Sequence, residues 1–154
     1  MAKQSAGILL YRLTEKGPEF FLVHPGGPFW AKKDSHAWSI PKGEFTAEED
    51  PLEAAKREFE EETGNKISAD FIKLRPIKQK GGKEVFCFAC EENFDPSSLK
   101  SNTFEIEWPP RSGKRQSFPE VDKGEWFDAL TAKTRINEYQ IAFIDEVLTK
   151  IHLK

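Results

Sequence analysis

The stretch at residues 57–64 reads R-E-F-E-E-E-T-G and places four glutamates within five positions. On an α-helix, at about 100° per residue, Glu58, Glu61 and Glu62 fall on one face, whereas Glu60 points elsewhere. Like charges three and four residues apart repel one another, more strongly where they are partly withdrawn from water. An isolated charge run usually marks a solvated face, but three converging carboxylates favour a neutralising cation.

The chemistry that suits this face is the binding of a hard divalent cation. Mg²⁺ keeps several waters and bridges one or two carboxylates to substrate phosphates. Such an ion makes a bound water more acidic and stabilises charge on phosphoryl oxygens, while a spare carboxylate accepts the proton. Lys56 and Arg57 are the nearby helical cations, against eight acidic residues between Glu48 and Glu62. The pattern therefore predicts phosphate chemistry.

Arg57 itself has two readings that the sequence leaves open. It can be the i+4 ion-pair partner of Glu53, in the favourable order with the glutamate first. It can also orient a carboxylate of the acidic face through a charge-assisted hydrogen bond. The two roles are compatible.

The element that must carry these residues is a helix over 51–63. Asp50 is the expected N-cap, Pro51 suits the first helical position, Glu53 completes a capping box and Gly64 follows the last turn. Its apolar stripe, which should pack on a sheet, consists of Leu52, Ala55 and Phe59.

The remaining pattern predicts a mixed sheet between helices, an α/β or α+β fold. A second helix is expected over 137–152, and long loops over 24–37 and 109–115. Strands are expected at 5–13, 19–24, 67–77, 83–91, 104–108 and 124–127, and residues 38–40 form a short apolar stretch. Cys87 and Cys90 are three residues apart in a strand and so point to opposite faces, which favours buried core thiols over a metal site.

Composition sets further bounds. The chain has 154 residues, 38% hydrophobic and 32% charged, and a formal net charge of −3. We expect a single domain over 1–154. The charge offers no global attraction to nucleic acid or anionic membranes. No signal peptide or membrane-spanning stretch is evident, so we expect a cytoplasmic protein.

Residues 43–65 resemble the Nudix box, the signature of the Nudix hydrolase family. The match runs from Gly43 through five residues to Glu49, and through seven more to the R-E-F-E-E-E-T-G stretch. It departs at the last position, where the family has an aliphatic residue and this chain has Asn65. We expect Ile67 to take over that packing role.

The resemblance implies a Nudix-type α/β/α sandwich and hydrolysis of a nucleoside diphosphate linked to another group X. It implies that Glu58 and Glu62 bind Mg²⁺ or Mn²⁺, with Glu61 as a further ligand or base and the Gly43 carbonyl as another ligand. Glu120, in a segment that resembles the family's later acidic loop, is a candidate additional base or ligand, or an ordinary loop glutamate. Residues 38–43 resemble members that cleave dinucleoside polyphosphates.

Phosphate binding must use the metal ion and basic side chains, because the chain has no G-x-x-x-x-G-K-[ST] loop to cradle phosphates. Lys42 and Lys83 are the main candidates, and Trp30 is a candidate platform for a base. Arg111, Lys114 and Arg115 are weaker candidates that fit a solvated surface better. Phe29 and Trp108 could also serve as platforms or instead cap the core, and His36 is a candidate pocket residue.

Three hypotheses remain open at this stage. The first is a pyrophosphohydrolase for a small-molecule nucleotide, either a dinucleoside polyphosphate or a nucleoside triphosphate, nucleotide sugar or capped RNA. The second is a non-catalytic nucleotide-binding module with the same fold. The third is a plain acidic helix in an unrelated domain. We expect no membrane association, no stable nucleic-acid complex, and a monomer or homodimer.

Overall fold

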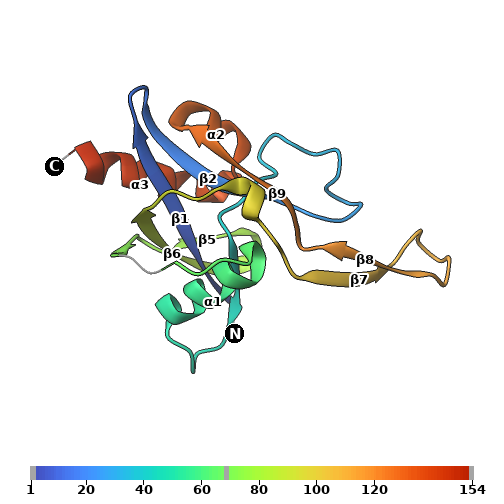
Figure 1. Cartoon of the computed structure of the whole chain (residues 1–154). Helices are drawn as coiled ribbons and strands as arrows, with labels where there is room; N and C mark the ends of the chain where they lie inside the picture. Colours follow the sequence, from blue (N-terminus) through green and yellow to red (C-terminus); the bar gives the residue numbers. More distant parts are fainter. Residues whose placement is uncertain (1–2, 68–69, 153–154) are drawn as a thin grey trace.

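A mixed sheet forms the centre of the molecule (Figure 1). The computed structural model describes residues 3–67 and 70–152, and within them seven strands hydrogen-bond in the order β4-β6-β1-β2-β9, with β3 on β1 and β5 on β6. β1 runs parallel to β6 and antiparallel to β2 and β3. The strands are β1 (Gln4–Thr14), β2 (Gly17–Pro25), β3 (Lys42–Phe45), β4 (Ile72–Lys73), β5 (Ile77–Lys78), β6 (Glu84–Glu91) and β9 (Val121–Asp128). The predicted mixed sheet is confirmed.

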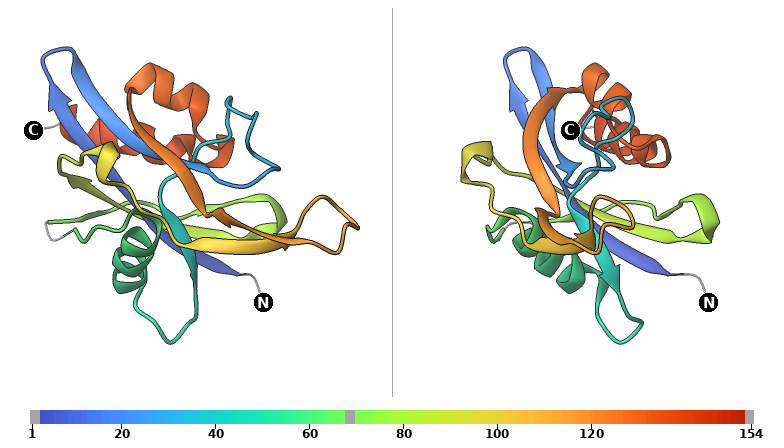
Figure 2. Two further views of the ribbon diagram at one scale, coloured as in Figure 1. Left: turned by 45° about the vertical axis from the view of Figure 1, so that its right-hand side comes forward. Right: turned by 90° about the vertical axis from the view of Figure 1, so that its right-hand side faces the viewer.

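Helices cover both faces of this sheet (Figure 2). Helix α1 (Pro51–Thr63) packs on one face, and α2 (Ala129–Arg135) and α3 (Ile141–His152) lie on the other. Side chains of β1 alternate between the two layers, as a strand requires. Ile8 and Leu10 join the core under α1, whereas Leu9 and Tyr11 join the core under α3. The α/β/α sandwich is therefore confirmed.

Helix α1 begins and ends where its caps predict. The carboxylate of Asp50 accepts a hydrogen bond from the Glu53 amide at 3.1 Å. Gly64 ends the helix with a φ of 78°, a left-handed conformation that glycine adopts readily, and its amide donates to the Glu60 carbonyl at 2.7 Å. Phe59 is fully buried, so the apolar stripe fixes the rotation of the helix on the sheet.

The segment that follows α1 differs from its prediction. A continuous strand was expected over 67–77, but the described part holds the short strands β4 and β5, and residues 68–69 lie outside the described residues. Pro76 cannot donate a hydrogen bond to a neighbouring strand, which is one reason for the interruption. Ile67 packs against the core under α1, so the expected replacement for the aliphatic residue at position 65 is confirmed.

Two further elements were not predicted. Helix α2 has seven residues and is capped by Asp128, whose carboxylate accepts from the Thr131 amide at 2.7 Å. The predicted helix over 137–152 is instead a 3₁₀ turn, Glu138–Gln140, followed by α3.

A two-stranded hairpin projects from the body of the protein (Figures 1 and 2). It consists of β7 (Thr103–Glu107), which was predicted, and β8 (Arg115–Pro119), which was not. The chain leading into β7 is tied to the end of α1. The amides of Lys100 and Asn102 donate to the carbonyl oxygens of Thr63 and Glu61, at 2.8 and 3.0 Å.

The two cysteines occupy opposite layers, as predicted. Cys87 belongs to the core under α3 and Cys90 to the core under α1, and both are buried free thiols. In the described part of the chain, no helix is long and apolar enough to span a membrane.

Candidate active site

Helix α1 and strand β3 bring Glu58 directly against Gly43. Glu58 is 9% exposed, an unusually low value for a carboxylate. A Cβ atom added to Gly43 would lie 2.0 Å from Glu58 Oε2, so a larger residue cannot occupy position 43 without displacing this carboxylate. The glycine is needed here for close approach and not for an unusual backbone angle.

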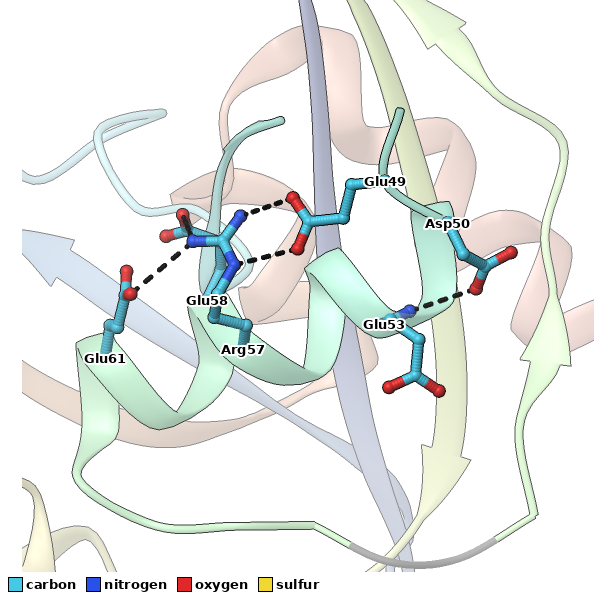
Figure 3. A network of polar contacts seen from close by, with 6 residues as sticks. All are labelled: Glu49, Asp50, Glu53, Arg57, Glu58 and Glu61. Carbon is cyan, nitrogen blue, oxygen red and sulfur yellow. Dashed lines mark hydrogen bonds and ion pairs between the residues drawn. The ribbon is translucent and has the colours of Figure 1, made fainter. Parts of the chain in front are cut away.

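Arg57 links three carboxylates on this side of the helix (Figure 3). Its Nε and Nη2 atoms donate to the two oxygens of Glu49, each at 2.9 Å, and Nη1 donates to Glu58 at 2.8 Å and Glu61 at 3.4 Å. Hydrogen bonding to Glu49 is the main cause of a raised Arg57 pKa. The expectation that Arg57 contacts a carboxylate of the acidic face is confirmed.

The alternative expectation, an Arg57–Glu53 pair, is wrong. Glu53 turns away from Arg57 and pairs with Lys56 at 3.7 Å. The guanidinium of Arg57 makes a bidentate contact with Glu49, which is a stronger interaction than a single hydrogen bond to the residue at i+4. The sequence carried a signal for Glu49, because this residue is a fixed position of the signature in residues 43–65, but no role was assigned to it.

The acidic face has more negative charge than its surroundings neutralise. Burial raises the pKa of Glu62 to about 8, with the charge of Glu58 as the next cause and Lys42 opposing both. Burial also raises the pKa of Glu58, followed by the charge of Glu61, against the hydrogen bond from Arg57. Raised pKa values in neighbouring acids are typical of functional sites.

Glu120 joins this cluster from a distant part of the sequence. Burial and the charge of Glu61 raise its pKa, and its own charge acts on Glu58 and Glu62. The position of Glu120 is set by the hydrogen bond from the Gly26 amide to its carbonyl, 2.9 Å long. The acidic cluster, as named from here on, comprises Glu58, Glu61, Glu62 and Glu120.

The two predicted phosphate-binding lysines lie near each other beside the acidic cluster. Burial lowers the pKa of Lys42, the charge of Lys83 lowers it further, and the charges of Glu62 and Glu58 oppose this. Lys83 Nζ lies 3.4 Å from a carboxylate oxygen of Glu44. Burial disfavours the charged form of an ammonium group, so an anion placed beside Lys42 would favour its protonation.

The other predicted residues lie farther out. Trp30 is 40% exposed in the loop between β2 and β3, where Lys33 Nζ lies 5.0 Å from its ring centre. Arg111 and Lys114 lie in the turn of the projecting hairpin, and Arg115 begins β8. His36 lines a pocket of about 540 Å³ together with Asn137, Glu138 and Tyr139.

The loop that carries Trp30 is fixed by residues that the sequence did not single out for this role. His24 is buried, and its ring nitrogens contact the Asp122 carboxylate at 2.9 Å and the Lys33 carbonyl at 2.7 Å. The indole of Trp38 donates to Asp34 at 2.8 Å. These contacts join segments that are distant in sequence, so local patterns could not reveal them.

The residues of the cluster fit a divalent metal ion in chemistry, though they are not gathered into a finished coordination shell. Within residues 3–67 and 70–152, no three Asp, Glu, His or Cys side chains are arranged closely enough to hold an ion. Arg57 engages Glu58 and Glu61, so a divalent ion would compete with its guanidinium for their oxygens. Carboxylate oxygens are hard donors, which Mg²⁺ and Mn²⁺ prefer. A bound cation would also lower the raised pKa values of these carboxylates.

Comparison with known proteins places the chain among relatives of this architecture. It is similar to an Ap4A hydrolase from C. elegans, with 16% identity, a TM-score of 0.65, and coverage of 97% of this chain and 99% of that one. It is also similar to the NUDIX domain of Shewanella oneidensis NrtR, solved with ADP ribose, at 13% identity, TM-score 0.64, and 98% and 89% coverage. At these identities the likeness concerns the fold.

A curated relative shares more sequence over a shorter stretch. It is an octanoyltransferase from Myxococcus xanthus, 32% identical over 99 residues, which cover 64% of this chain and 25% of that protein. The chain thus spans about a quarter of that relative's length. The family model of the NUDIX domain matches residues 1–147. A match over nearly the whole sequence shows that the chain belongs to the Nudix hydrolase family.

Proposed function

We propose that this protein hydrolyses the pyrophosphate linkage of a nucleoside diphosphate joined to another group, with a dinucleoside polyphosphate as the preferred substrate. The observation that carries the proposal is the acidic cluster, in which Glu58 lies buried against Gly43 beside the half-buried Glu61 and Glu62. Neighbouring negative charges, including that of the loop residue Glu120, help to raise the pKa of Glu58 and of Glu62. Like charges that are partly withdrawn from water are costly unless a cation joins them.

Glu58 and Glu62 would hold Mg²⁺ or Mn²⁺, with Glu61 and the carbonyl of Gly43 as further ligands. When bound, such an ion supplies Lewis-acid stabilisation of phosphoryl oxygens and lowers the pKa of a coordinated water. Arg57 would keep Glu58 and Glu49 in place through its hydrogen bonds. Arg57 would therefore act as a positioning residue for these carboxylates.

Glu61 or Glu120 would accept the proton of the attacking water. Both belong to the acidic cluster, and Glu120 lies in the bend between β8 and β9, apart from the elements that carry the proposed metal ligands, so it can act without leaving the ion. As the water oxygen bonds to phosphorus, the phosphoanhydride bond breaks and the leaving phosphate takes up the electron pair. Lys42 and Lys83 would neutralise phosphate charge beside the acidic cluster.

Two observations favour a dinucleoside polyphosphate. Residues 38–43 resemble the corresponding segment of family members with that activity, and the fold is similar to that of the C. elegans Ap4A hydrolase. The NrtR domain bound ADP ribose in its crystal structure, which makes nucleotide sugars the leading alternative class.

The test is product analysis in ¹⁸O-labelled water with Mg²⁺, across dinucleoside polyphosphates, nucleoside triphosphates, ADP-ribose and capped RNA. We expect nucleotide products with label on one phosphate, and we expect Glu62→Gln to lower turnover at least about 100-fold. Glu60→Gln is the matched control, because Glu60 lies on the same helix and pairs with Lys66 at 3.8 Å, outside the acidic cluster.

The hydrolase proposal would be abandoned if every substrate stayed intact, or if both glutamine variants kept full turnover. Calorimetry that detected nucleotide binding without Mg²⁺, and without product, would instead support a non-catalytic nucleotide-binding module.

A further inference from the structure

We infer that the projecting hairpin and the loop beside it form a substrate arm that binds the distal nucleotide of an extended dinucleoside polyphosphate. The substrate arm consists of residues 26–33 and 103–119. The inference rests on the proposed function, and it adds a binding site for the half of the substrate that lies farther from the acidic cluster.

The arm starts at the acidic cluster. Glu120 follows the last residue of β8 directly, and the Gly26 amide donates to its carbonyl at 2.9 Å. A Cβ atom on Gly26 would lie 1.9 Å from the Pro119 carbonyl oxygen, so the glycine allows the loop to touch the base of the hairpin. At about 3.3 Å per residue, β8 carries the chain roughly 17 Å from Glu120 to Arg115.

Three cations lie at the far end of the arm. Arg111, Lys114 and Arg115 are exposed, and across the described residues no carboxylate oxygen lies within 4.0 Å of their side-chain nitrogens. Arginines elsewhere do have such partners, among them Arg12 with Glu19 and Arg57 with Glu49. The cations of the arm are therefore available to an external anion.

The turn that presents these cations is ordered. The Trp108 amide donates to the Lys114 carbonyl at 2.9 Å, and the Arg111 amide donates to the Glu107 carboxylate at 3.0 Å. Arg111 has a φ of 63°, in the left-handed region where glycine would be the relaxed choice. An arginine at a position that favours glycine motivates the hypothesis that its side chain has a function there.

Exposed aromatic rings lie in the loop of the arm, and one of them contacts the turn of the hairpin. Phe29 is 62% exposed and meets the edge of Trp108 with ring centres 5.3 Å apart. Trp30 is 40% exposed, with Lys33 above its ring. Exposed rings interleaved with cations are typical of sites where nucleobases stack and phosphates are neutralised.

The length of the arm selects among substrate classes. A ligand whose phosphoanhydride lies at the acidic cluster must extend roughly 17 Å to reach the tip, which a second nucleotide provides and a nucleoside triphosphate does not. A long nucleic acid is disfavoured, because the chain carries a formal net charge of −3 and so offers no overall attraction to a polyanion. The length of the arm and the charge of the chain therefore point to a dinucleoside polyphosphate.

The experiment compares a long substrate, diadenosine tetraphosphate, with a short one, ADP-ribose, at saturating Mg²⁺. The first variant combines Arg111→Ala, Lys114→Ala and Arg115→Ala. We expect it to raise KM for the long substrate about tenfold or more with little change in kcat, because uniform binding is lost, and to leave the short substrate unaffected. The matched control removes three exposed cations outside the arm, through Lys16→Ala, Lys73→Ala and Lys78→Ala.

A second variant separates recognition from folding. Arg111→Gly relieves the left-handed backbone, so Tm should stay level or rise while KM for the long substrate rises. A residue that served only the turn would give no loss of affinity. A third variant, Phe29→Ala with Trp30→Ala, should weaken long-substrate binding in the same selective way.

A binding readout keeps this inference distinct from the proposed hydrolysis. Diadenosine tetraphosphate should quench tryptophan fluorescence in Glu62→Gln with Mg²⁺ present, and the triple alanine change in the arm should weaken that titration about tenfold or more. If both substrates are hydrolysed and the triple alanine change affects them equally, the substrate arm is wrong and the proposed function stands. Absence of all hydrolysis would overturn the proposed function, and the titration would then show whether the arm binds diadenosine tetraphosphate.

Tighter binding of a 5′-phosphorylated RNA oligonucleotide than of diadenosine tetraphosphate would overturn the choice of ligand.

Discussion

Replacement of Glu62 by glutamine should stabilise the metal-free protein at alkaline pH while it removes activity. The pKa of Glu62 lies at about 8 in the folded protein, against 4.5 for an ordinary glutamate. Between these two values the folded state holds a proton that the unfolded state has lost, so the wild-type protein loses stability as pH rises through this window. Below about 4.5 both states are protonated, and above about 8 the full penalty is present.

The size of the effect follows from the same two values. The gap between 4.5 and about 8, at about 1.4 kcal/mol for each pH unit, corresponds to roughly 5 kcal/mol. For a protein of this size that is a Tm difference on the order of 10 °C. Glutamine is close to isosteric and has no charge to bury, so the variant should be the more stable protein at pH 9 and should approach the wild type near pH 5.

The measurement is a series of thermal melts from pH 5 to 9 in chelator, for the wild type, Glu62→Gln and Glu60→Gln. Glu60 is half-buried on the same helix and pairs with Lys66, so its variant should follow the wild-type pH profile. Addition of Mg²⁺ should stabilise the wild type more than Glu62→Gln. A stability gap between the wild type and Glu62→Gln that stayed constant with pH would refute the burial of this charge.

Three other changes probe the geometry around the acidic cluster. Gly43→Ala should lower kcat/KM about 100-fold, since its Cβ would displace the Glu58 carboxylate; steady-state kinetics with a far-UV circular dichroism check would show this. Arg57→Lys should lower kcat/KM about tenfold or more, because lysine cannot reproduce the paired hydrogen bonds to Glu49, and unchanged kinetics would speak against a positioning role. Asp50→Ala should cost about 1 kcal/mol in urea unfolding through loss of the helix N-cap, with turnover unchanged.

Local signals made helix α1 predictable from the sequence. Asp50, Pro51 and Gly64 define its two ends through contacts within a few residues, and the structure has the helix at 51–63 as expected. The apolar runs of β1, β2 and β6 were an equally local signal, because these strands are buried on both faces and have nearly continuous apolar sequences. Spacing on a helix also predicted that Glu58, Glu61 and Glu62 share one face, and their convergence on one metal ion stays a prediction.

Elements stabilised by distant partners were harder to predict. Strand β8 has the sequence R-Q-S-F-P, in which only Phe118 is half-buried, and it forms because β7 pairs with it. The contact of Arg57 with Glu49 depends on how the chain before α1 folds back, which helical spacing cannot report. Glu120 was proposed through a family resemblance, and its role stays a prediction. Hydrogen bonds of its backbone to Gly26 and Asn102 hold it between the β2–β3 loop and the hairpin, where the charge of Glu61 contributes to its raised pKa.

The end of α1 joins the acidic cluster to the substrate arm. The last carbonyl groups of a helix lack partners within the helix and must find them elsewhere. Here the Glu61 and Thr63 carbonyls accept hydrogen bonds from Asn102 and Lys100, the residues that lead into β7. The same turn of helix therefore presents carboxylates on one side and anchors the hairpin by its backbone. Because one short segment performs both tasks, the distance between the acidic cluster and the hairpin is fixed by helix geometry, which is what a fixed-length two-nucleotide substrate requires.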